Sequence, residues 1–168
     1  MDTGPLSPDN YTAEAVARLL QLEPLEHEGG YYRRTAESDV IQPGTGRRAY
    51  SIIYYLLTPA GFSALHKLGT DETWSFHAGD MLESLRLAPD GSGKIVRIGL
   101  DIDEGAVPLS VIPANIWQGT RLAPGGRWAL ISCFVAPEFR WSDFTLGDYD
   151  VLAKEYPAHA KDIRALVR

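Results

Sequence analysis

The middle of the chain alternates short apolar runs with clusters of Gly, Pro, Asp and Asn. Runs of this length, rich in β-branched and aromatic residues and bounded by turn residues, predict β-strands. We expect strands at residues 30–34, 51–57, 63–67, 72–77, 81–87, 94–99, 109–112, 117–122 and 128–134. Because no helical pattern lies between them, the pattern predicts an all-β fold, an antiparallel sandwich or barrel.

Helical patterns flank this region. Thr12 is the expected N-cap of a helix with apolar residues at helical spacing, and Pro24 ends it. Asp148 is the expected cap of a short helix reaching Tyr156, followed by an amphipathic segment at residues 159–167. We therefore expect a flexible leader at residues 1–10 and a single domain at residues 11–168. Its barrel core would span about residues 28–136 and its C-terminal helical extension about residues 143–168.

Composition narrows the class of protein. The 168 residues are 45% hydrophobic and 23% charged, as in a globular domain with a sizeable core. A net charge of −6 argues against nucleic-acid binding, which requires a basic face. The N-terminal segment is polar and no apolar run approaches the roughly 18 residues of a membrane span, so we expect no membrane contact and a cytoplasmic location. The single Cys133 lies in an apolar run and is expected to be buried.

Candidate chemistry concentrates in residues 61–79, GFSALHKLGTDETWSFHAG. His66 and Glu72 fall on successive predicted strands joined by a short turn, so both side chains can point into one cavity. A second candidate hairpin, residues 111–119, contributes Gln118. Imidazole and carboxylate suit divalent iron, manganese, nickel or zinc, and they also suit acid–base catalysis without a metal.

This spacing resembles the two motifs of the cupin superfamily, with matching positions at Gly61, His66, Glu72, Gly79, Pro113 and Gln118. Typical cupins hold a metal with three His and one Glu. Here Leu68 replaces the second His of the first motif, Asn115 replaces the glycine of the second, and Gln118 replaces its His. Gln oxygen is a poor ligand for these metals, so a metal site formed by His66, Glu72 and Gln118 is expected to be weak.

A more extensive resemblance is to the DUF985 (cupin-5) family. It rests on EGGYY at residues 28–32, IYYLL at 53–57, SALHKLGTDETWSFHAGD at 63–80, PANIWQG at 113–119 and VAPEF at 135–139. In that family the leucine and glutamine substitutions are usual, whereas Glu26-His27 and Glu138 depart from its His-Pro and Gly. The resemblance implies a double-stranded β-helix jelly roll, a homodimer and a deep polar pocket for a small-molecule ligand.

Three functions remain open on this basis. The first is an isomerase or epimerase acting on a small polar or carbohydrate-like substrate, with His66 as general base and Glu72 as its partner acid. The second is a metal-dependent, oxygenase-like enzyme, and the third a non-catalytic metabolite-binding module. The predicted substrate-binding residues are Gln118, Tyr54, Trp74, His77 and Glu28. Aromatic residues of this kind occur more often in a core, and strict alternation turns His77 away from Glu72.

Overall fold

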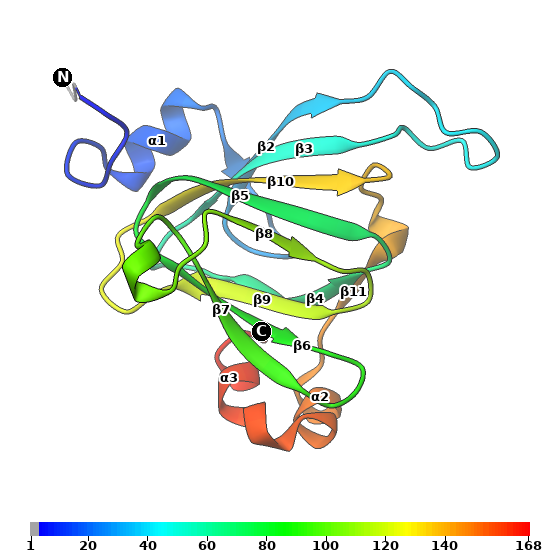
Figure 1. The fold of residues 1–168 in the computed structure, drawn as a ribbon. Coiled ribbons are helices and arrows are strands. Elements are labelled where there is room, and N and C mark those ends of the chain that lie inside the picture. The colour runs from blue at the N-terminus through cyan, green and yellow to red at the C-terminus, as the bar shows by residue number, and fades with distance from the viewer. Residues whose placement is uncertain (1–3) are drawn as a thin grey trace.

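The computed structural model describes residues 4–168. Two antiparallel sheets face each other across a common interior (Figure 1). In spatial order the first sheet contains β1 (Glu23–Pro24), β2 (Tyr31–Glu37), β3 (Ser51–Leu57), β10 (Ala129–Ala136), β5 (Asp71–Gly79) and β8 (Leu109–Ile112). The second contains β11 (Phe144–Leu146), β4 (Ser63–Leu68), β9 (Trp117–Leu122), β6 (Leu82–Leu87) and β7 (Gly93–Ile98). The predicted all-β jelly-roll barrel is confirmed.

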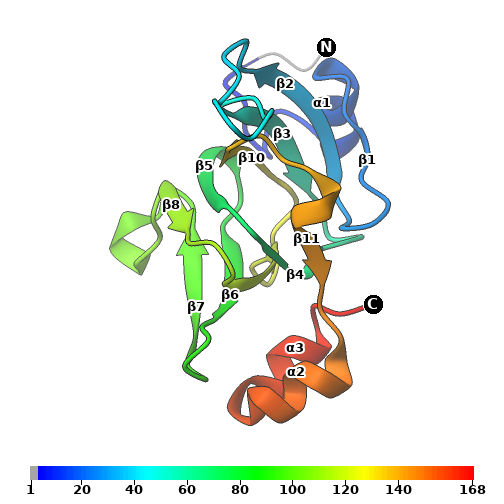
Figure 2. The same ribbon diagram turned by 90° about the vertical axis from the view of Figure 1, so that its right-hand side faces the viewer.

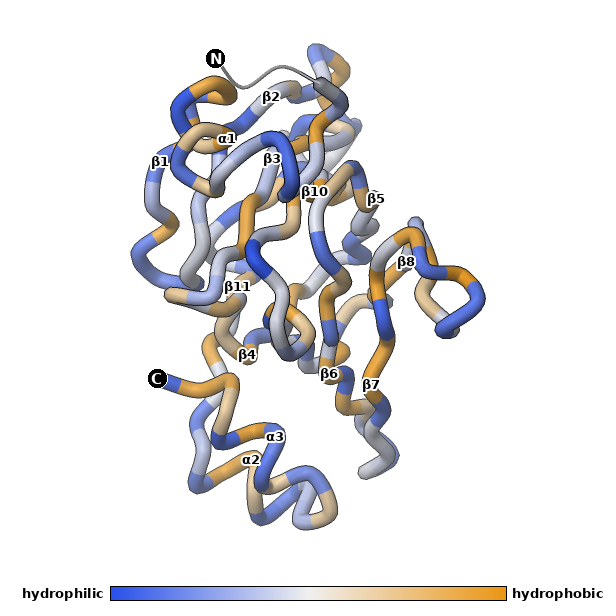
Figure 3. Tube along the Cα trace, turned by 90° about the vertical axis from the view of Figure 1, so that its left-hand side faces the viewer, coloured by the Kyte–Doolittle hydropathy of each residue, from blue (hydrophilic) through white to orange (hydrophobic). Residues whose placement is uncertain are grey.

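Every predicted strand overlaps an observed one. The strands that the sequence did not predict, β1 and β11, are two and three residues long and add to the outer edges of the two sheets. Runs this short carry no detectable alternation, which explains why they were missed. Elsewhere the alternation is visible along the trace, for example where apolar and polar residues succeed one another in β7 and β8 (Figure 3).

The helices cover outer surfaces and leave the interior to the strands. α1 (Ala13–Leu19) packs on the outer face of the first sheet, and Ala15 N–H donates to the Thr12 hydroxyl that caps it, as predicted. α2 (Tyr149–Glu155) and α3 (Ala160–Arg164) pack under the second sheet at the other end of the molecule (Figure 2). Short 3-10 helices also occur at Ile102–Glu104, Trp141–Asp143 and Pro157–His159. Within residues 4–168, no helix has both the length and the apolar character needed to cross a membrane.

The predicted leader is only partly described, because residues 1–3 lie outside the described residues. Residues 4–10 form turns that contact the domain: Asp9 pairs with Arg127 at 2.9 Å. Next to them, Trp128 Nε1 donates to the Tyr11 carbonyl oxygen at 2.8 Å. The flexibility of the leader stays a prediction.

The interior between the sheets is divided into two parts. One end is filled by apolar side chains of both sheets, among them Tyr55, Leu57, Trp74, Phe76, Leu82 and Leu122. The other end holds buried polar residues at inward-facing positions of the strands: Ser51, Ser63, His66, Glu72, Arg86 and Gln118. Buried polar groups are costly unless they are satisfied, so this polar end is the place to look for function.

Candidate functional site

His66 lies on β4 and its side chain faces the interior, while its neighbours Leu65 and Lys67 face outward. It is only 2% exposed, and its ring stacks on Phe144 of β11 with ring centroids 4.8 Å apart. Its Nδ1 lies 2.7 Å from the carbonyl oxygen of Ala64. Because a carbonyl oxygen only accepts, Nδ1 carries a proton. In the neutral form of the ring, the lone pair is then on Nε2, the nitrogen that can act as a base.

Glu72 enters the same region from β5, on the opposite sheet, and is 7% exposed. Gln118 of β9 donates an amide hydrogen to its Oε2 at 2.6 Å. Burial raises the pKa of the Glu72 carboxyl above its ordinary value, although nearby His66 opposes the shift; the charge of Glu28 adds to it. The structure therefore favours a protonated Glu72 more than an exposed position would, and Oε1 is the oxygen left to carry that proton.

His66 and Glu72 both line one pocket of about 140 Å³. The imidazole comes from the second sheet and the carboxyl from the first, so the barrel interior brings together groups that the sequence places on successive strands. Further polar or aromatic residues of the same pocket are Glu28, Tyr32, Arg34, Ser51, Cys133, Phe139, Arg140 and Trp141. An imidazole and a carboxyl with a raised pKa in one pocket are suited to proton transfer.

Two other predicted site residues adjoin this pair. Gln118 is buried behind Glu72 and holds its carboxyl without lining the pocket itself. Glu28 lines the pocket, and its Oε1 accepts a hydrogen bond of 2.6 Å from the Ser63 hydroxyl. The adjoining Gly29 has φ of 107°, and a Cβ there would lie 2.2 Å from the Phe62 carbonyl oxygen, so the backbone approaches closely here within the chain.

The remaining predicted residues, Tyr54, His77 and Trp74, do not line this pocket. On β3, Tyr55 faces the interior, so alternation turns Tyr54 to the outer face, where its ring meets that of His77 edge-on at 6.0 Å. Trp74 does face inward, but it lies in the apolar core, where it packs edge-on against Tyr55.

Several pocket residues were not among the predicted site residues. Cys133 on β10 and Arg34 on β2 occupy inward-facing positions, and strand alternation with Val135 and Tyr32 is the signal that could have found them. Arg140 and Trp141 follow β10 in a segment without regular periodicity. Nothing in the local sequence pattern reveals which way such loop side chains point.

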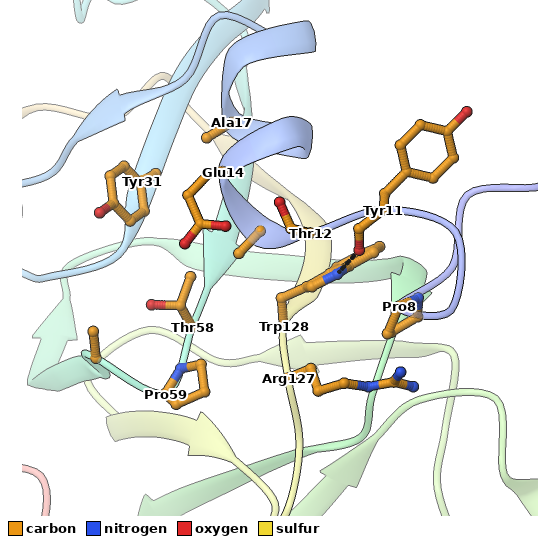
Figure 4. Close-up of a pocket in the computed structure, with 12 residues that line it drawn as sticks. Pro8, Tyr11, Thr12, Glu14, Ala17, Tyr31, Thr58, Pro59, Arg127 and Trp128 are labelled. Atoms are coloured by element: carbon orange, nitrogen blue, oxygen red, sulfur yellow. Dashed lines mark hydrogen bonds between the residues drawn. The ribbon is translucent and has the colours of Figure 1, made fainter. Parts of the chain in front are cut away.

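A larger groove, of about 650 Å³, lies beside α1 on the outer surface (Figure 4). Glu14 and Tyr31 face Thr58 and Pro59 across it. None of the predicted site residues lines this groove, and the Arg127 cation at its edge is already paired with two carboxylates. We therefore place the candidate site in the smaller interior pocket.

The fold and the polar interior now permit comparison with known proteins. The sequence profile of the Cupin superfamily (DUF985) matches residues 14–147. The chain belongs to this family. Among curated proteins, the DUF985 chain is 30% identical over 135 residues to Uncharacterized protein YML079W of Saccharomyces cerevisiae, covering 70% of this chain and 67% of the yeast protein.

Solved structures extend the comparison. Protein SO0799 from Shewanella oneidensis is 32% identical, with a TM-score of 0.87 over 94% of this chain and 98% of that one. A hypothetical protein from Leishmania major is also 32% identical, with a TM-score of 0.85 over 94% and 99% of the two chains. Oxalate decarboxylase from Bacillus subtilis shares 13% identity and a TM-score of 0.53, over 86% of this chain and 38% of that one. At this identity the last similarity concerns the cupin fold alone.

The residues of this DUF985 protein do not fit the metal site of a typical cupin. Within residues 4–168, no three His, Cys, Asp or Glu side chains lie close enough together to hold an ion. Of the predicted ligands, Gln118 donates to Glu72 through its amide nitrogen and does not line the pocket. One imidazole and one carboxyl are a poor donor set for iron, manganese, nickel or zinc.

We accordingly expect elemental analysis of the freshly purified DUF985 protein to find far less than one such ion per chain. Treatment with a chelator should leave its melting temperature unchanged, since no folding free energy depends on a metal. A stoichiometric ion whose removal lowers the melting temperature would contradict this expectation and restore the metal-dependent hypothesis.

The buried carboxyl also predicts a pH dependence of stability. Because burial raises the folded pKa of Glu72, its protonated form contributes stability that is fully present below the unfolded pKa, about 4.3. This contribution is lost as the pH rises through the folded pKa. The unfolding free energy of the wild type, minus that of Glu72→Gln, should therefore fall across this window, with a slope of at most about 1.4 kcal/mol per pH unit. Urea denaturation of both proteins over a pH series measures the difference, and a flat or rising difference would show that the pKa is not raised.

Proposed function

We propose that this cupin is an isomerase or epimerase that moves a proton at the carbon next to a carbonyl group of a small, carbohydrate-like substrate. The observation that supports it is the convergence of the His66 imidazole, whose Nδ1 is bound to the Ala64 carbonyl oxygen, and the buried Glu72 carboxyl on one pocket. The imidazole can act as a base through Nε2, and burial shifts the Glu72 carboxyl toward its acid form. Pairs of this kind are suited to acid–base catalysis.

The proposed reaction moves two protons and no other group. His66 Nε2 removes the proton from the carbon, the electron pair of that C–H bond forms a carbon–carbon double bond, and the carbonyl oxygen takes a proton from Glu72 Oε1. Return of a proton to carbon, on the neighbouring carbon or the opposite face, and of the other to Glu72 completes the isomerisation. Gln118 holds Glu72 Oε2 throughout. Tyr32, a tyrosine that lines the pocket, is the candidate to assist proton return.

The size and lining of the pocket limit the substrate. Its volume of about 140 Å³ is smaller than the roughly 300–1,000 Å³ of most drug-sized ligand sites, which favours a compact substrate. Arg34 and Arg140 stand at the pocket with about half of each side chain exposed, and Trp141 presents a partly exposed ring. These groups suit a short hydroxy-carbonyl compound with several oxygen atoms.

Proton exchange tests the proposal directly. The purified protein is incubated in D₂O with glyceraldehyde and with dihydroxyacetone, and loss of the C–H signals next to the carbonyl is followed by ¹H NMR. We expect exchange faster than in the protein-free control. Saturable binding of these compounds without exchange would instead support the metabolite-binding module.

A homodimer is part of the same proposal. The family resemblance supports it, and so does an outer face of the first sheet that exposes Leu109, Val111 and Phe134. The cytoplasmic location stays a prediction of the sequence.

A further inference from the structure

A row of polar side chains crosses the concave face of the second sheet. Register pairs His66 of β4 with Gln118 of β9, Gln118 with Arg86 of β6, and Arg86 with Lys94 of β7. Directly paired residues in antiparallel strands point to the same face, so the four side chains form a continuous line. His66 lies at one end, in the pocket already described. Arg86 and Lys94 lie at the other end, on the far side of Gln118.

Arg86 is a buried cation with unused hydrogen-bond donors. It is 7% exposed, and its Nη1 donates to the Val111 carbonyl oxygen of β8 at 3.0 Å. Its Nε and Nη2 have no partner among residues 4–168. Burial lowers the pKa of Arg86 to about 10, so it stays charged at neutral pH. Glu72 is the carboxyl that attracts Arg86. Because burial raises the pKa of Glu72 and so favours its neutral form, Glu72 balances the charge of Arg86 only in part.

Arg86 and Lys94 both line a cleft of about 370 Å³ between the β6–β7 hairpin and the end of β8. The cleft shares no lining residue with the pocket of His66 and Glu72. Ser92 is on its wall, but its hydroxyl and its N–H both donate to Asp90 Oδ1, so it offers no free hydroxyl hydrogen. The charged groups that line this cleft are therefore both cations, the buried Arg86 guanidinium and the exposed Lys94 ammonium.

We propose that this cleft is a binding site for a small oxyanion, the phosphate or carboxylate group of a ligand. An oxyanion would supply the missing counter-charge beside the buried guanidinium and accept hydrogen bonds from the Lys94 ammonium group. Guanidinium matches phosphate and carboxylate geometry, and ammonium adds a second charge. The proposal does not depend on the proposed isomerase activity, because no residue of that pocket contributes to the cleft.

The test uses inorganic phosphate and acetate as probes, at constant ionic strength maintained with chloride. Backbone amide shifts of Ser92, Gly93 and Lys94 are followed by ¹H–¹⁵N NMR. We expect saturable shifts with at least one probe, and comparison of the two probes distinguishes a phosphate site from a carboxylate site. Shifts that stay linear and equal to those in chloride for both probes would overturn the proposal.

Two substitutions on β7 make the test specific. Lys94→Gln removes the exposed cation of the cleft and should weaken binding by about tenfold, the loss of one charge-assisted contact. Arg97→Gln removes the same charge from the same strand, at an exposed position outside the cleft, and should leave binding unchanged. Equal affinity in the two variants would overturn the proposal. Arg86→Gln should abolish saturable binding of the probes, provided that thermal denaturation shows that this variant is folded. If Arg86→Gln does not fold, the comparison of Lys94→Gln with Arg97→Gln alone tests the proposal.

Discussion

Replacing His66 with glutamine is expected to lower the rate of deuterium exchange by about 10²–10⁴-fold, the usual contribution of a general base. Glutamine is close to histidine in size, and its amide nitrogen can still donate to the Ala64 carbonyl oxygen, which the imidazole Nδ1 contacts at 2.7 Å. What the variant lacks is the basic lone pair of Nε2. The fold and the pocket should therefore persist while proton removal fails.

His77→Gln is the matched control for this experiment. It makes the same chemical change on the outer face of the first sheet, where His77 meets Tyr54. Its exchange rate should equal that of the wild type, which also tests the earlier expectation that His77 binds substrate. A similar loss in both variants would point to a general effect on the protein, and an unchanged rate in His66→Gln would exclude His66 as the base.

The part of the site that could be predicted from sequence is the part governed by strand periodicity and motif spacing. His66 and Glu72 were assigned to one cavity because they lie on successive strands around a short turn, and the structure places both in one pocket. Gln118 was predicted from the same motifs to bind substrate or a metal; it donates to Glu72 and does not line the pocket. In each case a local pattern determines which face of a sheet a side chain occupies.

The rest depends on tertiary contacts that no local pattern encodes. Trp141 reaches the pocket only because the segment after β10 folds back across the end of the barrel, where its ring packs against Phe139, Phe144 and His27. The cleft of Arg86 and Lys94 likewise requires β8 to belong to the opposite sheet from β7. Alternation gives the direction of a side chain, but it does not give the neighbouring element that completes a pocket.

Trp74 also shows that strand alternation does not by itself locate a site. Alternation correctly predicts that it faces inward, together with Glu72 on the same strand. Yet the interior is divided along the strand: Glu72 belongs to the polar end and Trp74, two residues further on, to the apolar core. The role of Trp74 is packing within the apolar core, and that role is measurable as stability.

Trp74→Ala is therefore expected to destabilise the protein by about 3–5 kcal/mol, as found for large aromatic side chains removed from well-packed cores. Trp74 is 1% exposed and contacts Tyr55 edge-on, with ring centroids 5.9 Å apart. Trp141→Ala deletes the same side chain at a position that is 50% exposed. Its loss should cost about 1 kcal/mol, mainly its aromatic contacts.

Urea denaturation of the two variants and the wild type, followed by circular dichroism, measures this difference. The midpoint should fall much further for Trp74→Ala than for Trp141→Ala, while the exchange assay should respond to Trp141→Ala through weaker substrate binding. Equal midpoints would mean that Trp74 is not part of the packed core, and its assignment to the substrate site would then have to be reconsidered.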